Sequence, residues 1–336
     1  MSTQDVGAFS FSALASAKRS IGLILPTLPQ GPDLNWDIHT IANQAEALGA
    51  DALWVCDHLA WHSPVLECFS ALSLAAHGTS KCCIGAGVLQ LPLRPTPLVA
   101  KSSSSIALIS GGRFILGVGV GVHNGEYDAL DVGFHERGKR TELAIGQLRE
   151  IWNHGGLIEG ETRYLQKPIM GGIPIWVGGS SPRARSRAAR LGDGWMPLFV
   201  PPETIGQEIA KLRDEAAQHS RNANEIVTSI VLFVSTDKNS GENSLATRGL
   251  EWMGSLYNLA GSKFAKHLVC GSPEQCVDLF EQYYLQGVQH IVVFVTDDNP
   301  LEQFSLIQDE LRSRRTTASP ERESGLESTI ENAKGH

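Results

Sequence analysis

The sequence predicts an α/β protein that folds as a (β/α)8 TIM barrel with insertion segments. Short, continuously apolar runs alternate with helical stretches along most of the 336 residues. Apolar strands that alternate with helices indicate a parallel sheet covered on both faces. Eight such units favour a closed barrel over an open, doubly wound sheet. Many of the 34 glycines stand near the ends of the apolar runs, where a barrel builds its site.

The expected elements follow one another in a regular order. In the helix 37–49, Ile38, Ile41 and Ala45 recur at helical spacing and Gly49 ends the pattern. The expected strands are 21–26, 52–57, 82–89, 113–121, 174–179, 194–198, 226–235 and 290–296. The expected helices are 37–49, 96–109, 136–152, 182–191, 203–219, 273–286 and 300–312, with a helical insertion at about 240–265.

These elements are expected to form one domain, 21–315, between an N-terminal arm, 1–20, and a disordered polar tail, 316–336. The net charge of −8, without a basic stripe, argues against nucleic acid as a partner. The apolar stretch 8–17 comes before the first basic pair, which reverses the order of a signal peptide, and it is too short to span a bilayer. We therefore expect a cytoplasmic protein with no membrane partner.

The segment after the second expected strand carries a dense group of reactive and aromatic side chains. Asp57, His58, Trp61 and His62 fall within 57–62. Residues that follow barrel strands form the site, and histidine exchanges protons near neutral pH. We predict His58 as the catalytic residue; the alternative is that Asp57 only caps a turn and His58 lies on the surface. No metal site is expected, because HExxH is absent and no second His/Cys cluster follows.

Glycines mark the third and fourth expected strands. Gly87 stands inside strand 82–89, and Gly121 ends strand 113–121. A glycine within a strand indicates a bulge or a close backbone approach. At the mouth of the barrel, Gly121 leaves room for a flat ring or a phosphate. The alternative reading of these glycines is tight packing alone.

The fifth expected strand ends in a phosphate-binding pattern. Gly178, Gly179, Ser180 and Ser181 come directly before a helix that begins with Pro182. Free N–H groups and the helix dipole at such a start attract an anion. A serine cap alone would explain the serines but does not need the glycine pair. We therefore predict that these four residues bind a cofactor phosphate.

Six segments together resemble a known family. They are ADALWVCDH (50–58), GAGV (85–88), SGGRFILGVGVG (110–121), FHERG (134–138), PIWVGGS (174–180) and GDGW (192–195). Their order and spacing, over about 21–314, resemble the luciferase-like monooxygenase superfamily. More narrowly, they resemble its branch that uses the deazaflavin coenzyme F420.

The resemblance implies where the cofactor lies. It implies that the ring stacks on a bulge in strand three, often built on a non-prolyl cis peptide, and the matching bond here is Gly87–Val88. It implies that Asp57 and His58 line the ring end, with the phosphate at 178–181. The branch that acts on sugar phosphates has a glutamate where this sequence has Val122, followed by His123. A sugar phosphate is therefore not the expected substrate, and we place Trp61, His62 and His123 in the substrate pocket.

The expected function is an F420-dependent oxidoreductase that transfers a hydride between the deazaflavin and a small organic substrate. The alternative on the same fold is a monooxygenase that uses reduced FMN and oxygen. Two other classes are a metal-dependent hydrolase that uses Asp57, His58 and His62, and a flavin-binding relative without activity. The absence of further ligand clusters argues against the hydrolase. The resemblance also implies a homodimer.

Overall fold

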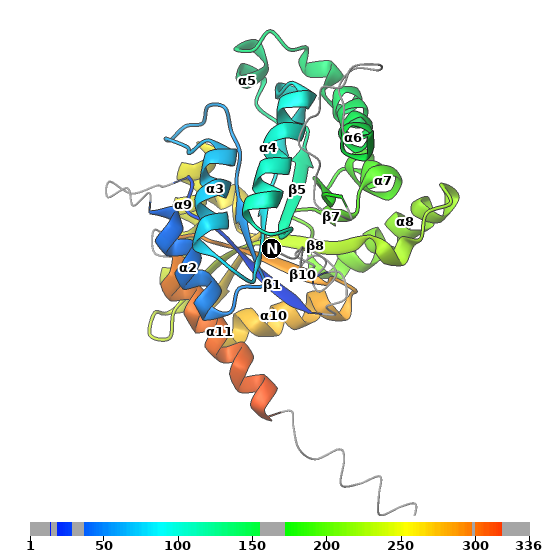
Figure 1. Ribbon diagram of the computed structural model, residues 1–336. Helices are drawn as coiled ribbons and strands as arrows, with labels where there is room; N and C mark the ends of the chain where they lie inside the picture. The colour runs from blue at the N-terminus through cyan, green and yellow to red at the C-terminus, as the bar shows by residue number, and fades with distance from the viewer. Residues whose placement is uncertain (1–13, 15–18, 29–36, 155–171, 298–299, 318–336) are drawn as a thin grey trace, which may run out of the picture.

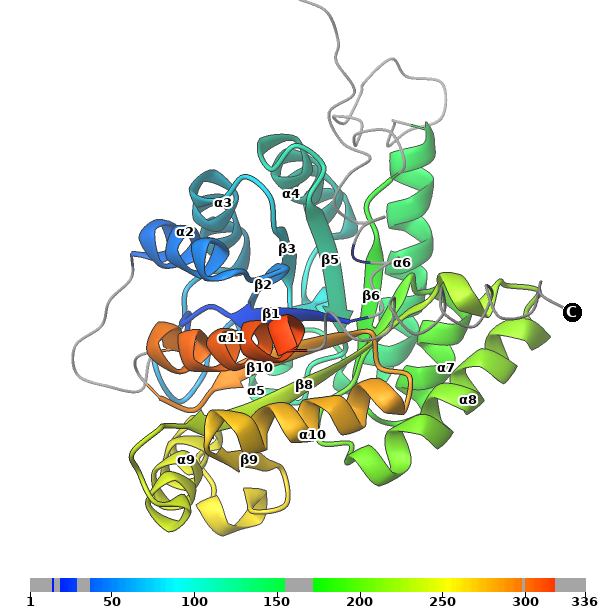
Figure 2. The ribbon, with the colours of Figure 1, turned by 90° about the horizontal axis from the view of Figure 1, so that it is seen from below.

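Eight parallel strands close into a barrel surrounded by helices (Figures 1 and 2). The computed structural model describes residue 14 and residues 19–28, 37–154, 172–297 and 300–317. The ring runs β1-β2-β3-β5-β6-β7-β8-β10, and β10 pairs with both β1 and β8, which closes it. The predicted (β/α)8 TIM barrel is therefore confirmed. In the described part of the chain, no helix is long and apolar enough to cross a membrane.

The bounds of the elements are as follows. The strands are β1 Ser20–Ile24, β2 Ala52–Val55, β3 Cys83–Ala86, β4 Leu89–Gln90, β5 Phe114–Gly119, β6 Ile175–Gly178, β7 Gly194–Met196, β8 Val227–Thr236, β9 Leu268–Gly271 and β10 His290–Val295. The helices are α2 Ile38–Leu48, α3 Cys68–Gly78, α4 Thr96–Ile109, α5 Asn124–Asp128, α6 Arg137–His154, α7 Pro182–Leu191, α8 Pro202–Gln218, α9 Glu242–Tyr257, α10 Pro273–Leu285 and α11 Pro300–Thr317.

All eight barrel strands match the strands expected from the sequence, but three other elements do not appear in that expectation. Helix α3 begins after Glu67, whose carboxylate accepts hydrogen bonds from the N–H groups of Phe69 and Ser70. Glutamate is not a usual N-cap, so the start signal was missed. The short helix α5 and the strand β9 were also missed. β9 pairs with the last part of β8, and only four residues form it.

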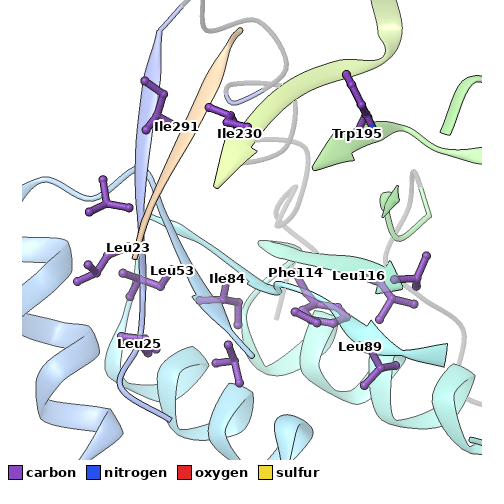
Figure 3. Packing of buried hydrophobic residues seen from close by; sticks show 14 of the residues in the cluster. Leu23, Leu25, Leu53, Ile84, Leu89, Phe114, Leu116, Trp195, Ile230 and Ile291 are labelled. Carbon is purple, nitrogen blue, oxygen red and sulfur yellow. The ribbon is translucent and has the colours of Figure 1, made fainter. Parts of the chain in front are cut away.

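The main core lies between the strands and the surrounding helices. Figure 3 shows part of it, where Leu23, Leu53 and Ile84 project from neighbouring strands. Every residue of β1 and β2 is buried, as expected for parallel strands covered on both faces. This layer holds the strand ends in fixed positions, and the loops that follow them carry the site.

A second, smaller core fills the barrel floor. Trp54 and Trp176 stand across the interior with their rings 5.0 Å apart. The fully buried His290 joins them, and its Nε2 accepts a hydrogen bond of 3.1 Å from Trp54 Nε1. Its Nδ1 lies 2.8 Å from Ser20 Oγ, which itself donates to the carbonyl of Gln289. Because Trp54 donates to Nε2, the ring proton resides on Nδ1 and the imidazole is neutral.

The size of the Trp54 ring explains the glycine at position 85 in β3. A Cβ added to Gly85 would stand 2.5 Å from Trp54 Cζ3 and 3.0 Å from the carbonyl oxygen of Ile115. We therefore expect Gly85→Ala to lower the free energy of unfolding by about 1–3 kcal/mol, because overpacking forces shifts in the core. Urea unfolding measures this change.

The matched control is Gly146→Ala on α6. A Cβ at Gly146 would meet nothing within 4 Å. Alanine is a better helix former, so this variant should be as stable as the wild type or more stable, by up to about 1 kcal/mol. Equal stability of the Gly85→Ala variant and the wild type would contradict the packing argument.

Candidate active site

A cavity of about 1270 Å³ lies at the C-terminal ends of the barrel strands. Its walls come from the loops after β2, β3, β5, β6 and β7 and from α9. The expected site residues that line it are Asp57, His58, Trp61, Gly87, Val88, Gly121, Gly178, Gly179, Ser180 and Ser181. His62 and His123 are exposed and contact the ring of Trp61 instead, with ring centres 5.0 and 6.0 Å away. Their contact with substrate stays a prediction.

Strand three is interrupted as the sequence predicts. β3 ends at Ala86, β4 begins at Leu89, and the Gly87–Val88 peptide between them is cis. The Val88 side chain projects toward β5 and β6, where a Cβ on Gly119 would stand 2.6 Å from Val88 Cγ2 and one on Gly178 would stand 2.9 Å from Val88 Cγ1. The glycines at these two positions therefore make room for Val88. This packing gives Gly178 a structural role that sequence reasoning did not foresee.

His58 is held by a buried glutamate rather than by its neighbour Asp57. The Nδ1 atom of His58 lies 3.3 Å from both carboxylate oxygens of Glu126. Gln90 Nε2 lies 3.1 Å from the same Nδ1 and donates to Glu126 at 3.0 Å. A carboxylate only accepts hydrogen bonds, so it favours the proton on Nδ1. Within the described residues, Nε2 of His58 has no hydrogen-bond partner, and the side chain lines the cavity.

Glu126 is kept ionised by the groups around it. Its carboxylate accepts hydrogen bonds from the backbone N–H groups of Leu59, at 2.7 Å, and Ala60, at 3.3 Å. Burial by itself raises the pKa of Glu126, but the hydrogen bonds and charge of His58, with those from Gln90 and Ala60, outweigh it and lower the pKa. The ionised carboxylate therefore fixes both the loop after β2 and the orientation of the His58 ring.

Asp57 forms a buried ion pair. Its two carboxylate oxygens each accept from Arg94 at 2.7 Å, and the backbone N–H of Gln90 donates to one of them at 2.8 Å. The carboxylate that contacts His58 is therefore that of Glu126 and not that of Asp57. Contact between Asp57 and a cofactor stays a prediction. In the residues that the structure describes, no group of three or more His, Cys, Asp or Glu side chains is arranged to hold a metal ion.

Cys56 also lines the cavity, next to the bulge. Its Sγ lies 3.8 Å from the carbonyl oxygen of Gly87. Burial, together with the charge of Asp57, raises the pKa of the Cys56 thiol to about 12. The thiol stays protonated at neutral pH and is a poor nucleophile.

Helix α9 covers one side of the cavity with aromatic side chains. Trp61 stacks on His58 with ring centres 3.8 Å apart, and its Nε1 donates to the carbonyl of Leu256 at 2.6 Å. This bond ties the loop after β2 to α9. The aromatic compartment is lined by Trp61, Phe199, Phe233, Tyr257 and Phe294. Such a wall suits an apolar ligand, with the polar groups of His58 at one end.

The segment of the predicted anion cradle also lines the cavity. Ser181 caps α7 by accepting from the N–H of Ala184, and the Ser180 hydroxyl bonds to the backbone of Leu198. Within the described residues, the backbone N–H groups of Ser180, Ser181 and Arg183 make no hydrogen bond. Gly179 has a φ of +106°, which turns the chain into the helix. Three free N–H groups at a helix start form a site for an anion.

A family model for luciferase-like monooxygenases matches residues 27–244. The chain belongs to the luciferase-like monooxygenase family. This family membership confirms the resemblance drawn from the six segments. It also identifies the chain as an oxidoreductase of the luciferase-like type. A protein of Mycobacterium tuberculosis without a described activity is 31% identical over 210 residues, which are 54% of this chain and 72% of the relative. The phthiodiolone/phenolphthiodiolone dimycocerosates ketoreductase of that species is 26% identical over 256 residues, 66% of this chain and 67% of the relative.

Solved structures share the fold of this luciferase-like protein. An F420-dependent secondary alcohol dehydrogenase, in complex with an F420-acetone adduct, has a TM-score of 0.74 at 17% identity. The match covers 87% of this chain and 97% of the dehydrogenase. A monooxygenase from Streptomyces bottropensis has a TM-score of 0.73 at 17% identity, covering 88% of this chain and 99% of the monooxygenase.

Three residues of the site in this luciferase-like protein were missed from the sequence. They are Gln90, Arg94 and Glu126. Glu126 lies 68 positions after His58 in the chain, and nothing in its own segment distinguishes it from nearby acidic residues such as Asp128. The family position that holds a glutamate is Val122 here, and this departure could have prompted a search for a carboxylate near the end of the fourth strand. The structure supplies that carboxylate one helical turn later.

Proposed function

We propose that this protein is an F420-dependent oxidoreductase that transfers a hydride between the deazaflavin and a small organic substrate. The observation that carries the proposal is the placement of His58 in the cavity, held at Nδ1 by Glu126 and with Nε2 left to act on a ligand. The cavity joins this residue to the Val88 bulge on one side and to the anion cradle on the other. A cofactor with a flat ring and a phosphate-bearing chain fits this arrangement, with the ring at the bulge and the phosphate at the cradle.

Unsatisfied polar groups at two places in the cavity fit such a cofactor. Gln90 Oε1 is buried without a hydrogen-bond partner in the described residues, and it stands where a Cβ on Gly121 would be only 2.3 Å away. The glycine therefore makes room for this acceptor, and a ring N–H of the cofactor would supply the missing donor. At the other end, the free N–H groups of 180, 181 and 183 would hold the phosphate. Val88 would support the face of the ring from below.

The residues of this chain then supply the proton chemistry. When bound, the deazaflavin gives or takes the hydride at the substrate carbon. Reduction of a carbonyl also needs a proton on its oxygen, and His58 Nε2 is suited to donate it and to take it back in the reverse reaction. Glu126 stabilises the charged imidazolium that exists before this donation. The substrate is thus expected to carry a carbonyl or a secondary alcohol beside an apolar body that fills the aromatic compartment.

The ketoreductase and the secondary alcohol dehydrogenase among the similar proteins support this choice, because both are named for carbonyl or alcohol chemistry. The second candidate is an FMN-dependent monooxygenase, and the monooxygenase from Streptomyces bottropensis shares the fold. His58, which Glu126 holds in place as a proton donor, favours hydride and proton transfer over oxygen insertion. The expected homodimer remains a prediction.

An absorbance titration of the protein with each cofactor tests the proposal. We expect F420 to bind with micromolar or tighter affinity and FMN to bind at least about tenfold more weakly, a difference of about 1.4 kcal/mol. The bound F420 should then be reduced by an apolar secondary alcohol. Tight FMN binding with no response to F420 would replace the proposal with the monooxygenase.

A further inference from the structure

The cavity continues beyond the anion cradle, between α6 and α7, which lie side by side in both views (Figures 1 and 2). We call this part the basic arm, and it is lined by Arg137, Lys139, Arg183, Arg185, Arg187 and Arg190. The two helices meet here, because Arg187 and Arg190 of α7 pair with Glu142 of α6 at 3.3 and 3.0 Å. The basic arm is therefore an extension of the same cavity that holds the cradle.

The charge of the basic arm opposes that of the whole chain. Six basic side chains line it, and the described carboxylates that line it are those of Glu142 and Glu215. The arm therefore has four more positive than negative side chains, whereas the full sequence has a net charge of −8. A local positive field inside a negative protein attracts anionic ligands to one place.

Some of these basic side chains form ion pairs within the protein, and others do not. Arg185 is held by Glu208 and by Glu215 at 2.8 Å, so its role is structural. In the part of the chain that the structure describes, neither Arg183 nor Lys139 has an ion-pair partner, and both are exposed. These two cations stand on opposite sides of the arm, one on α7 and one on α6.

Arg187 gives a second, independent sign of a missing ligand. It is 5% exposed, and its Nε has no hydrogen-bond partner among the described residues. The carboxylate of Glu142, which it contacts, is shared with Arg190. A buried guanidinium is stable only when its donors are satisfied. An additional anion in the arm would satisfy it.

We propose that the basic arm binds a second anionic group of the cofactor, a chain of carboxylates that continues from the phosphate in the cradle. The inference rests on the proposed function and extends it. Coenzyme F420 carries a phosphodiester followed by glutamate residues with free carboxylates, whereas FMN ends at a single phosphate. The arm therefore selects the deazaflavin cofactor by its tail as well as by its ring.

Fluorescence titration of the full chain with three deazaflavin forms tests the arm. The forms are the riboside without phosphate, the phospholactyl form without glutamates, and the form with several glutamates. We expect the wild type to bind the glutamate form about tenfold more tightly than the form without glutamates. In Arg183→Gln and in Arg187→Gln, this ratio should fall to within about twofold, while binding of the riboside stays unchanged.

Arg213→Gln is the matched control, since Arg213 is exposed on α8 and does not line the cavity. Its ratio should equal that of the wild type. Arg183 is exposed, so its variant should fold even if Arg187→Gln does not. If the wild type binds the forms with and without glutamates equally tightly and still binds the riboside, the proposed role of the basic arm is wrong, but the proposed function stands. If none of the three forms binds, the proposed function is wrong, and the proposed role of the basic arm is wrong as well.

Discussion

Replacing His58 with asparagine is expected to lower turnover by about a hundredfold or more while the affinity for the cofactor changes little. Asparagine keeps a donor toward Glu126, whose carboxylate lies 3.3 Å from Nδ1 in the wild type. It has no group that exchanges a proton near neutral pH, so only the chemistry at Nε2 is lost. Stopped-flow measurement of hydride transfer at saturating substrate, with a separate cofactor titration, measures both effects.

His219→Asn serves as the control for this substitution, because His219 is exposed at the end of α8. Its turnover should match that of the wild type. If His58→Asn instead weakens cofactor binding and retains turnover at saturation, His58 is a binding residue and the catalytic assignment is wrong. Glu126→Gln should lower turnover as well and should change its pH profile, because the carboxylate that stabilises the imidazolium is gone.

A steep loss of stability in acid is expected from His290. Burial lowers the pKa of His290 to about 3, from an ordinary value of 6.5. The folded state therefore holds the neutral ring, whereas the unfolded chain takes up a proton below about pH 6.5. The stabilising effect is complete above that pH and is lost as pH falls toward 3. Each pH unit within this window removes about 1.4 kcal/mol.

Urea unfolding between pH 7 and 4.5, at constant ionic strength, separates this effect from that of the carboxylates. The free energy of unfolding of His290→Gln should be lower than that of the wild type at pH 7, and it should fall less steeply toward acid. Protonation of the wild-type ring would break the bond that Nε2 accepts from Trp54. Parallel pH curves for the two proteins would show that His290 titrates normally when folded.

The barrel could be predicted from the sequence because its strands are largely apolar and several end at a glycine or a polar cluster. The interruption at Gly87–Val88 was also accessible, since a glycine there weakens a good strand. Helix α3 was not, because Glu67 is an atypical cap. The strand β9 was missed because its four residues pair only with the end of β8.

Candidate site residues that lie within one short segment could be predicted from the sequence. Contacts between residues of two distant segments could not. Gly178, Gly179 and the two serines form the cradle within four consecutive residues, so the pattern is local. The carboxylate that contacts His58 belongs to Glu126 on α5, 68 positions away in the chain, so no single segment reveals the pair. Adjacent side chains diverge at the end of a strand, and only the closed barrel brings the fourth strand's loop against the second's.

The barrel floor is filled by Trp54, Trp176, His290 and Leu14. This filling bears on the order in which ligands bind and leave during turnover. With these side chains packed below the Val88 bulge, the cavity is closed at its floor. A molecule that lies deep must arrive before one that lies above it, and it must leave later. We therefore expect the cofactor to enter first, the substrate to settle beneath α9 afterwards, and the product to depart before the spent cofactor.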